Sequence, residues 1–276
     1  LVTDENRFQL HIEPKFGFHE PHELSPMDID RLRLSLLKTH APATVRNVLE
    51  LLRRVINFGQ KKNLCDGLPF KLELPRTNNV KTEDLTPEQL QSLLDAIEDC
   101  SNVQVANLMK LALLTGMRRG ELFRLKWKDV DFQRGFIHIR SPKGGQDQKI
   151  PLNQSAKTLL EAHPRVEDSE YVFPGRKGRQ RVDCIKQVNQ IKEAAGLPKD
   201  FRALHGLRHV FASTLASSGQ VDMYTLQKLL THKSPHMTQR YAHLRDDALR
   251  AASEVAGDLV ERQSSKRRKT RKLKNG

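Results

Sequence analysis

Four short segments concentrate polar side chains of the kinds that act on phosphate groups. They are Thr115–Leu122 (TGMRRGEL), the glycine-rich turn around Lys143, Leu204–Thr214 (LHGLRHVFAST) and Leu230–Leu244 (LTHKSPHMTQRYAHL). Together they supply arginines, lysine, histidines and a tyrosine, without a cluster of acidic residues to hold Mg²⁺. The set favours phosphoryl transfer without a metal, in which cations stabilise the pentacoordinate phosphorus and a side-chain hydroxyl attacks it.

The first segment combines a helix end with two arginines. An apolar helix should stop at Gly116, and Arg118 and Arg119 then open the next helix. A helix N-terminus attracts anions, and an arginine there can bind a phosphate through two N–H groups. Glu121 lies three residues after Arg118 and could hold that guanidinium in place. An ordinary surface salt bridge would give the same spacing.

The third and fourth segments place histidines near a tyrosine. His205 shares one helix face with Arg208, three residues on, and with His209, four residues on. His232 should end one helix, and Tyr241 should lie on the following one. Because a tyrosine hydroxyl has a pKa of about 10 in water, surrounding arginines and histidine must favour its ionised, attacking form. By default, a helical tyrosine is a packing residue.

A lysine could supply the proton that the leaving 5′ oxygen needs. Lys143 stands at the tip of the expected hairpin, and Lys149 follows on its second strand. A flexible lysine can reach into a substrate as a general acid. Taken alone, however, lysines on a glycine-rich turn are usually just solvated.

Apolar periodicity and helix-end signals predict a mainly α-helical chain with a small antiparallel β-sheet. One helix start is well marked, with Thr86 as its cap, Pro87 in its first turn and Gln89 completing a capping box. The expected strands are Gly135–Arg140 and Gln148–Leu152. The expected helices are Met27–Thr39, Thr44–Lys62, Leu85–Asp99, Val103–Leu114, Ser155–Ala162, Val182–Ala195, Gly206–Ser217, Met223–Leu230, Thr238–Leu244 and Asp246–Val255.

The length of 276 residues predicts two domains. We expect a helical domain over 1–76, a linker over 77–84, a second domain over 85–262 and a basic disordered tail over 263–276. In the helix Thr44–Lys62, the apolar face should carry Val45, Val48, Leu49, Leu52, Val55 and Ile56. Its basic face carries the candidate DNA-binding residues Arg46, Arg53 and Arg54. Because position 1 is Leu, we expect the sequence to continue upstream.

The charge balance points to a polyanionic partner. There are 47 Lys and Arg against 33 Asp and Glu, a formal charge of +14. No apolar run reaches the roughly 18 residues that a membrane span requires, and the start lacks a signal-peptide pattern. Cys65, Cys100 and Cys184 are too scattered for a disulfide framework or a four-cysteine zinc site. We expect a cytoplasmic, nucleoid-associated protein with reduced thiols.

The ordered combination of TGMRRGEL, a lysine hairpin, LHGLRH and THKSP…TQRYAH resembles the active-site motifs of the tyrosine recombinases, the phage-integrase family. The resemblance extends over roughly Leu85–Ala256. It implies a two-domain fold in which residues 1–76 form a helical core-binding domain that clamps DNA. The catalytic residues that it implies are Arg118, Lys143, His205, Arg208, His232 and Tyr241, with Glu121 and His209 as supporting residues.

The resemblance also implies a mechanism and partners. Tyr241 would attack the scissile phosphate to give a 3′-phosphotyrosyl link, and Lys143 would protonate the leaving oxygen. The covalent link retains the bond energy, so no cofactor, ATP or metal is required. The partners would be double-stranded DNA at attachment-type sites of a mobile element such as a prophage, further copies of the chain in a tetramer, and accessory DNA-bending proteins. No membrane is involved.

Three alternatives remain open. A type IB topoisomerase would use much of the same chemistry, and a non-catalytic recombination accessory protein would bind DNA without cutting it. The third alternative is a zinc-dependent metallohydrolase, because the pairs His205/His209 and His232/His236 have the four-residue spacing that can bind zinc on a helix. No Glu follows either first histidine, as an HExxH protease would require.

Overall fold

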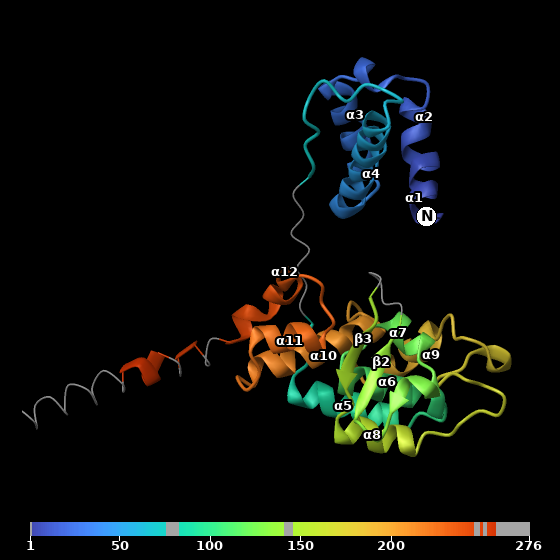
Figure 1. Ribbon diagram of the computed structural model, residues 1–276, viewed down its shortest axis with the longest axis vertical. Coiled ribbons are helices and arrows are strands. Elements are labelled where there is room, and N and C mark those ends of the chain that lie inside the picture. The colour runs from blue at the N-terminus through green and yellow to red at the C-terminus, as the bar shows by residue number, and fades with distance from the viewer. Residues whose placement is uncertain (1, 76–82, 141–145, 246–248, 251–252, 258–276) are drawn as a thin grey trace, which may run out of the picture. The chain divides into compact units, whose positions relative to one another are not determined.

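The computed structural model describes residues 2–75, 83–140, 146–245, 249–250 and 253–257. The chain divides into two compact units, Leu1–Lys81 and Thr82–Gly276 (Figure 1). Unit 1 is helical, whereas unit 2 combines helices with one small antiparallel sheet. The expected fold class, mainly α with a small antiparallel sheet, is confirmed.

Unit 1 is built around its longest helix. The elements are α1 (Val2–Arg7), the π-helical turn η1 (Phe8–Ile12), α2 (Glu13–Phe16), the 3₁₀ turn η2 (Pro21–Glu23), α3 (Pro26–Leu37) and α4 (Pro42–Lys61). Ser25 caps α3, accepting a hydrogen bond from the Asp28 backbone N–H and donating one from its own N–H to the Asp28 carboxylate. The core of the unit forms where α4 packs against α3 and η1.

The apolar face predicted for α4 is buried with one exception. The buried members of the prediction are Val45, Val48, Leu49, Leu52 and Ile56. Val55 was expected among them but is 44% exposed. Each residue turns a helix by about 100°, so Val55 lies roughly a quarter turn from Ile56 and leaves the buried stripe.

The first helix of unit 2 is strongly capped. Thr86 accepts from the Gln89 backbone N–H at 3.2 Å and the Gln89 side chain accepts from the Thr86 N–H at 3.0 Å, so the predicted capping box is confirmed. The elements in order are α5 (Pro87–Glu98), α6 (Val103–Thr115), α7 (Arg119–Arg124), η3 (Trp127–Asp129), β1 (Val130–Asp131), β2 (Phe136–Ile139), β3 (Gln148–Pro151), α8 (Gln154–Glu161), η4 (Arg176–Gly178), α9 (Ile185–Ala194), α10 (Ala203–Ser217), α11 (Met223–Leu229), α12 (Pro235–Thr238) and η5 (Gln239–Arg245).

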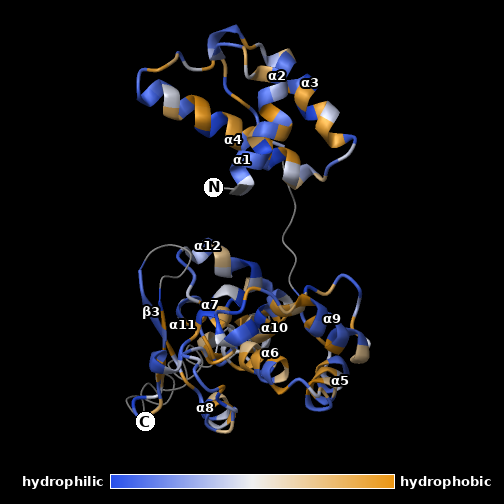
Figure 2. Ribbon diagram, turned by 90° about the vertical axis from the view of Figure 1, so that its right-hand side faces the viewer, coloured by the Kyte–Doolittle hydropathy of each residue, from blue (hydrophilic) through white to orange (hydrophobic). Residues whose placement is uncertain are grey.

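Two buried helices form the centre of this unit. Helix α6 packs against α10, α8, α5 and α9, and Figure 2 shows hydrophobic residues on α6. The predicted end of α6 is confirmed, because Gly116 adopts the left-handed conformation with φ of 63°. This turn leads the chain directly into the arginine segment.

The predicted hairpin is present and gains a third strand. Strand β2 pairs antiparallel with β3, with Ile137 opposite Ile150, and on its other edge with the two-residue strand β1. Ile137 and Ile150 are buried against the helical core. Strand β1 was not predicted, since two residues carry no alternation signal.

The segment around Tyr241 differs from the prediction. We expected one helix over Thr238–Leu244, but α12 ends at Thr238 and Tyr241 lies in the 3₁₀ helix η5. A 3₁₀ helix completes a turn in about three residues, so the side chains after Thr238 point in other directions than an α-helix would give them. Of the expected helix Asp246–Val255, residues 249–250 and 253–255 are described, and they are helical.

No described helix has the length and apolar character that crossing a membrane requires.

Candidate active site

The buried carboxylate of Glu121 holds the side chain and the backbone of Arg118 in place. Glu121 Oε1 accepts from Arg118 Nη1 at 2.9 Å, and Glu121 Oε2 accepts from the Arg118 backbone N–H at 2.8 Å. The Glu121 side chain is 3% exposed, and that of Arg118 is 28% exposed. The pair is therefore more than a surface salt bridge, because the acid is withdrawn from solvent while the arginine remains accessible.

Arg118 also contacts a residue 113 positions later. Its Nη1 donates to Thr231 Oγ1 at 2.6 Å and its Nη2 to the Thr231 backbone carbonyl at 3.3 Å. Thr231 is buried and has φ of 51°, an uncommon conformation for a β-branched residue. These bonds fix the turn that precedes His232.

Arg208 braces the same turn from helix α10. Its Nη1 donates to the Gly116 carbonyl at 2.6 Å, and its Nη2 donates to the Leu230 carbonyl. Burial, followed by the positive charge of Arg118, lowers the pKa of Arg208 to about 10, so it stays protonated at neutral pH. Two cations thus converge on the corner at Leu230 and Thr231, where they could share one phosphate.

Tyr241 contacts His209, which lies next to Arg208 on α10. The Tyr241 hydroxyl is 2.6 Å from His209 Nδ1, and the two residues are 2% and 3% exposed. His209 Nε2 is buried and has no hydrogen-bond partner among the described residues. Burial, together with the charges of His205 and nearby arginines, lowers the pKa of His209 to about 3. The negative charge of a DNA phosphate in the site would raise the pKa of His209, and the neutral imidazole could then accept the phenol proton, which is the step that creates an attacking oxygen.

The electrostatics at Tyr241 differ from the sequence-based expectation of an ionised nucleophile. Burial raises the pKa of the Tyr241 hydroxyl, while Arg240, Arg208 and Arg202 act in the opposite direction. Desolvation outweighs the arginines here because the phenol is almost completely withdrawn from water. We therefore expect Tyr241 to keep its proton in this position, hydrogen-bonded to His209.

His232 and His205 complete the cluster. His232 Nδ1 lies 2.8 Å from Thr238 Oγ1, and burial followed by the charges of Arg208 and Arg118 lowers the pKa of His232 to about 3. His205 is exposed, and its ring meets that of His209 edge to face at 4.8 Å. Its pKa is lowered by desolvation and then by the nearby arginines.

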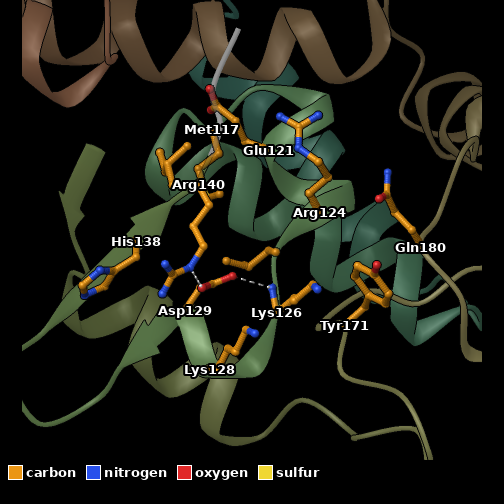
Figure 3. A pocket seen from close by; sticks show the side chains of 12 residues that line it. Met117, Glu121, Arg124, Lys126, Lys128, Asp129, His138, Arg140, Tyr171 and Gln180 are labelled. Carbon is orange, nitrogen blue, oxygen red and sulfur yellow. Dashed lines mark hydrogen bonds and ion pairs between the residues drawn. The ribbon is translucent and has the colours of Figure 1, made fainter. Parts of the chain in front are cut away.

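Lys143 lies outside the described residues, which stop at Arg140 and resume at Gln146. The base of the hairpin is described and firmly held. Arg140 Nε donates to Asp129 Oδ1 at 2.5 Å, and Asp129 also accepts from the Lys126 backbone N–H at 3.4 Å. Figure 3 shows both donors converging on Asp129, which is 3% exposed, inside a hollow of about 240 Å³. Lys149 is an exposed residue of β3.

The three candidate DNA-binding arginines of unit 1 have intramolecular partners. Arg46 donates to the Pro75 carbonyl at 2.9 Å. Arg53 pairs with Glu50 at 2.5 Å and Arg54 with Asp4 at 3.0 Å. The side chains of Arg53 and Arg54 are 43% and 54% exposed, so both can be reached from solvent.

Comparison with known proteins agrees with this geometry. Residues 83–248 match the phage integrase family. The tyrosine recombinase XerA of Pyrococcus furiosus is 31% identical over 194 residues, covering 68% of this chain and 67% of the relative. The tyrosine recombinase XerC of Oceanobacillus iheyensis is 30% identical over 224 residues, covering 76% and 72%.

The chain belongs to the phage integrase family. It is a site-specific tyrosine recombinase, as the resemblance of its motifs implied. Two solved structures share its fold. The Tn1549 transposon integrase, in complex with transposon right end DNA, has a TM-score of 0.76 and 20% identity over 93% of both chains. A lambda integrase dimer bound to a core site has a TM-score of 0.69 and 18% identity over 89% of this chain and 88% of the other.

The described part of the recombinase contains no complete set of zinc ligands, so the structure does not support the metallohydrolase alternative. No group of three or more His, Cys, Asp and Glu side chains there could hold a metal ion. Of the paired histidines, His209 is instead committed to Tyr241 through Nδ1. The edge-to-face packing of His205 on His209 is a ring contact, not a pair of ligands turned toward one ion.

Sequence reasoning missed two residues that shape the site of this recombinase. Thr231 accepts hydrogen bonds from both terminal nitrogens of Arg118, and Thr238 orients the His232 ring through a hydrogen bond to Nδ1. Their positions next to His232 and before Tyr241 were visible, but threonine has no pattern that marks such a role. The contact between Arg118 and Thr231 joins positions 113 apart, so it becomes apparent only from the fold.

Proposed function

We propose that this recombinase cuts and rejoins double-stranded DNA with Tyr241 as nucleophile, forming a 3′-phosphotyrosyl intermediate. The observation that carries the proposal is the convergence of Arg118 and Arg208 on the Leu230–Thr231 corner, beside a tyrosine already bonded to a neutral histidine. Anion-binding groups and a nucleophile with a proton acceptor are the minimum that such a displacement requires.

The contacts of Arg118, Arg208 and His209 support the roles proposed for them, and the roles proposed for His205, His232 and Lys143 come from the family motifs that these residues match. Arg118 and Arg208 hold the non-bridging phosphate oxygens and stabilise the charge that builds up on them. His205 and His232 add hydrogen bonds to the same phosphate. His209 accepts the proton of Tyr241 as its oxygen attacks phosphorus. The bond to the 5′ oxygen breaks, and Lys143 gives that oxygen a proton.

Rejoining reverses these steps in a partner duplex. A free 5′ hydroxyl attacks the phosphotyrosyl phosphorus and gives its proton to Lys143, the new phosphodiester forms, and the Tyr241 oxygen leaves as it regains its proton from His209. One bond is exchanged for a similar one, so neither ATP nor a metal cofactor is needed. The attack requires the buried Tyr241 hydroxyl to become accessible to the scissile phosphate while it keeps its hydrogen bond to His209.

The assembly is proposed by analogy with the relatives. Residues 1–76 would act as the DNA clamp, through Arg46, Arg53 and Arg54, and residues 85–262 as the catalytic domain. The partners would be attachment-type DNA sites, three further copies of the chain and accessory DNA-bending proteins. The relatives are named recombinases and integrases, so a topoisomerase or a non-catalytic accessory protein is not favoured. Acting on such DNA would place the protein at the nucleoid.

A strand-exchange assay tests this function. The protein is incubated in EDTA with two duplexes that carry the attachment site of the element encoding it, one of them labelled. We expect label to appear in recombinant strands with the wild type and not with Tyr241→Phe. Tyr224→Phe is the matched control, because Tyr224 is 65% exposed on α11, and it should behave as the wild type. Exchange that survives in Tyr241→Phe would contradict the proposal.

A further inference from the structure

A hollow with a volume of about 450 Å³ lies beside Arg118 in unit 2. Its wall includes three arginines, Arg118, Arg119 and Arg202, together with His205. The start of α9 and Leu204 contribute the apolar part of the lining, and Asp183 adds a carboxylate to it. Of the three arginines around this hollow, only Arg118 is assigned to the scissile phosphate. The other two, Arg119 and Arg202, have no role in binding that phosphate.

Arg202 is held in this wall by Glu83. The Glu83 carboxylate accepts from the Arg202 backbone N–H at 2.7 Å, from Nε at 3.1 Å and from Nη2 at 3.0 Å. The backbone carbonyl of Glu83 also accepts from Ser213 Oγ, on helix α10, at 3.4 Å. Glu83 is 11% exposed at its side chain, whereas Arg202 is 42% exposed.

This bonding pattern repeats that of Arg118 and Glu121. In both pairs one carboxylate accepts from the backbone N–H and from the guanidinium of the same arginine, which precedes a helix. In both pairs the acid is nearly buried and the arginine is open to solvent. Such bracing fixes the guanidinium plane before a ligand arrives, so less side-chain entropy is lost on binding.

The guanidinium of Arg202 keeps capacity for a ligand. Glu83 engages the edge formed by Nε and Nη2, and Nη1 lies outside that pair. The charges of the pair also act on the Tyr241 hydroxyl. Burial raises the pKa of Tyr241 most, while the charge of Arg202 lowers it and that of Glu83 raises it. A DNA strand with one phosphate at Arg118 would pass its next phosphates along this wall.

We propose that Arg202 binds a second DNA phosphate, adjacent to the scissile one, and that Glu83 is the positioning residue that orients it. The inference deepens the proposed function and rests on it. Arg202 would fix the register of the strand at the cleavage point, while Arg118 and Arg208 act on the reacting phosphorus. A second anchored phosphate limits the rotation of the scissile phosphate away from the line of attack.

The test combines a protein variant with neutral DNA linkages. Nicked duplexes of the attachment site carry a methylphosphonate at one phosphate near the scissile position, a different one in each duplex. The rate of covalent complex formation is measured for the wild type and for Arg202→Gln. We expect one neutral linkage to slow the wild type by about tenfold, the scale of one charge-assisted hydrogen bond. The same linkage should not slow Arg202→Gln any further.

Matched variants separate orientation from charge. Glu83→Gln should lose part of the sensitivity to that one linkage, and Arg202→Lys should do the same because lysine lacks the planar fork that Glu83 orients. Both comparisons remain available if Arg202→Gln does not fold. Arg134→Gln, at an exposed turn position after β1, is the control and should show the wild-type sensitivity at every linkage.

Two results would count against the inference, and they can be told apart. At every position, Arg202→Gln and the neutral linkage could slow covalent complex formation independently, so that their fold-changes multiply. In that case Arg202 binds none of the phosphates tested, and the inference alone is wrong. If the wild type forms no Tyr241-dependent complex even with the unmodified duplex, the proposed function fails and the inference fails with it.

Discussion

At the scale of single residues, the site depends on acids that hold cations in place. Glu121 is 3% exposed and joins the backbone and side chain of Arg118. In Glu121→Gln, the amide would turn an NH₂ group toward one of these donors. We expect the rate of covalent complex formation to fall by about tenfold, or roughly 1.4 kcal/mol. Glu98→Gln, which removes an exposed partner of Lys110, should leave the rate unchanged, and equal rates in the two variants would contradict the role of Glu121.

The buried His209 should make stability depend on pH. Its pKa falls from the ordinary 6.5 to about 3 in the folded protein, so between these two values only the unfolded chain takes up the proton. This contribution to stability is complete above pH 6.5 and is lost as the pH falls toward 3. Between pH 7 and pH 5, His209 should account for about 2 kcal/mol of lost stability.

Denaturant unfolding at both pH values measures this contribution. His209→Gln should lose about 2 kcal/mol less than the wild type on going from pH 7 to pH 5. Glutamine keeps a polar group near the Tyr241 hydroxyl without a titrating ring. The same loss of stability in both proteins would show that His209 is not the group responsible.

At the scale of elements, Gly116 joins the end of α6 to the arginine segment. Its φ is 63°, its carbonyl accepts from Arg208, and a Cβ there would overlap the Phe211 ring. Gly196 has a similar φ of 64° but no atom within 4 Å of a Cβ. Gly196→Ala should therefore cost only the backbone strain, about 1 kcal/mol.

Gly116→Ala should cost more than Gly196→Ala, by about 1–3 kcal/mol, because the overlap with Phe211 adds to the strain. It should also slow DNA cleavage, since displacing Phe211 disturbs the helix that carries Arg208 and His209. Thermal or denaturant unfolding of the two variants gives the comparison. Equal losses of stability would mean that the Phe211 ring gives way without cost.

Local patterns were sufficient for most of the elements, but not for β1, for the 3₁₀ helix around Tyr241 or for the arrangement of the site. The capping box at Thr86, the end of α6 at Gly116 and the pairing of Arg118 with Glu121 all depend on residues within four positions, so the sequence could predict them. The bonds from Arg118 to Thr231 and the burial of Tyr241 against His209 depend on how distant helices pack. The same reason explains why the sequence suggested an ionised tyrosine whereas burial raises its pKa.

At the scale of the whole molecule, the clamp hypothesis predicts how DNA binding responds to salt. Replacing Arg46, Arg53 and Arg54 together with Gln should weaken binding. The slope of log K against log salt should become shallower by about 0.9 for each DNA phosphate that these arginines no longer neutralise. Glu50→Gln offers a change in the opposite direction, because it releases Arg53 from its acid and should strengthen binding. Unchanged affinity and slope in the triple variant would contradict the proposed role of this face.

The central claim is that DNA becomes covalently attached to Tyr241. The most direct measurement traps the complex on a nicked duplex in EDTA, digests the protein and identifies the DNA-linked peptide by mass spectrometry. The chain has three tyrosines, so the assignment is unambiguous. The account predicts a peptide carrying Tyr241 joined to a 3′ phosphate, with a free 5′ hydroxyl on the other strand end. Attachment through Tyr171 or Tyr224, or to a 5′ phosphate, would contradict it.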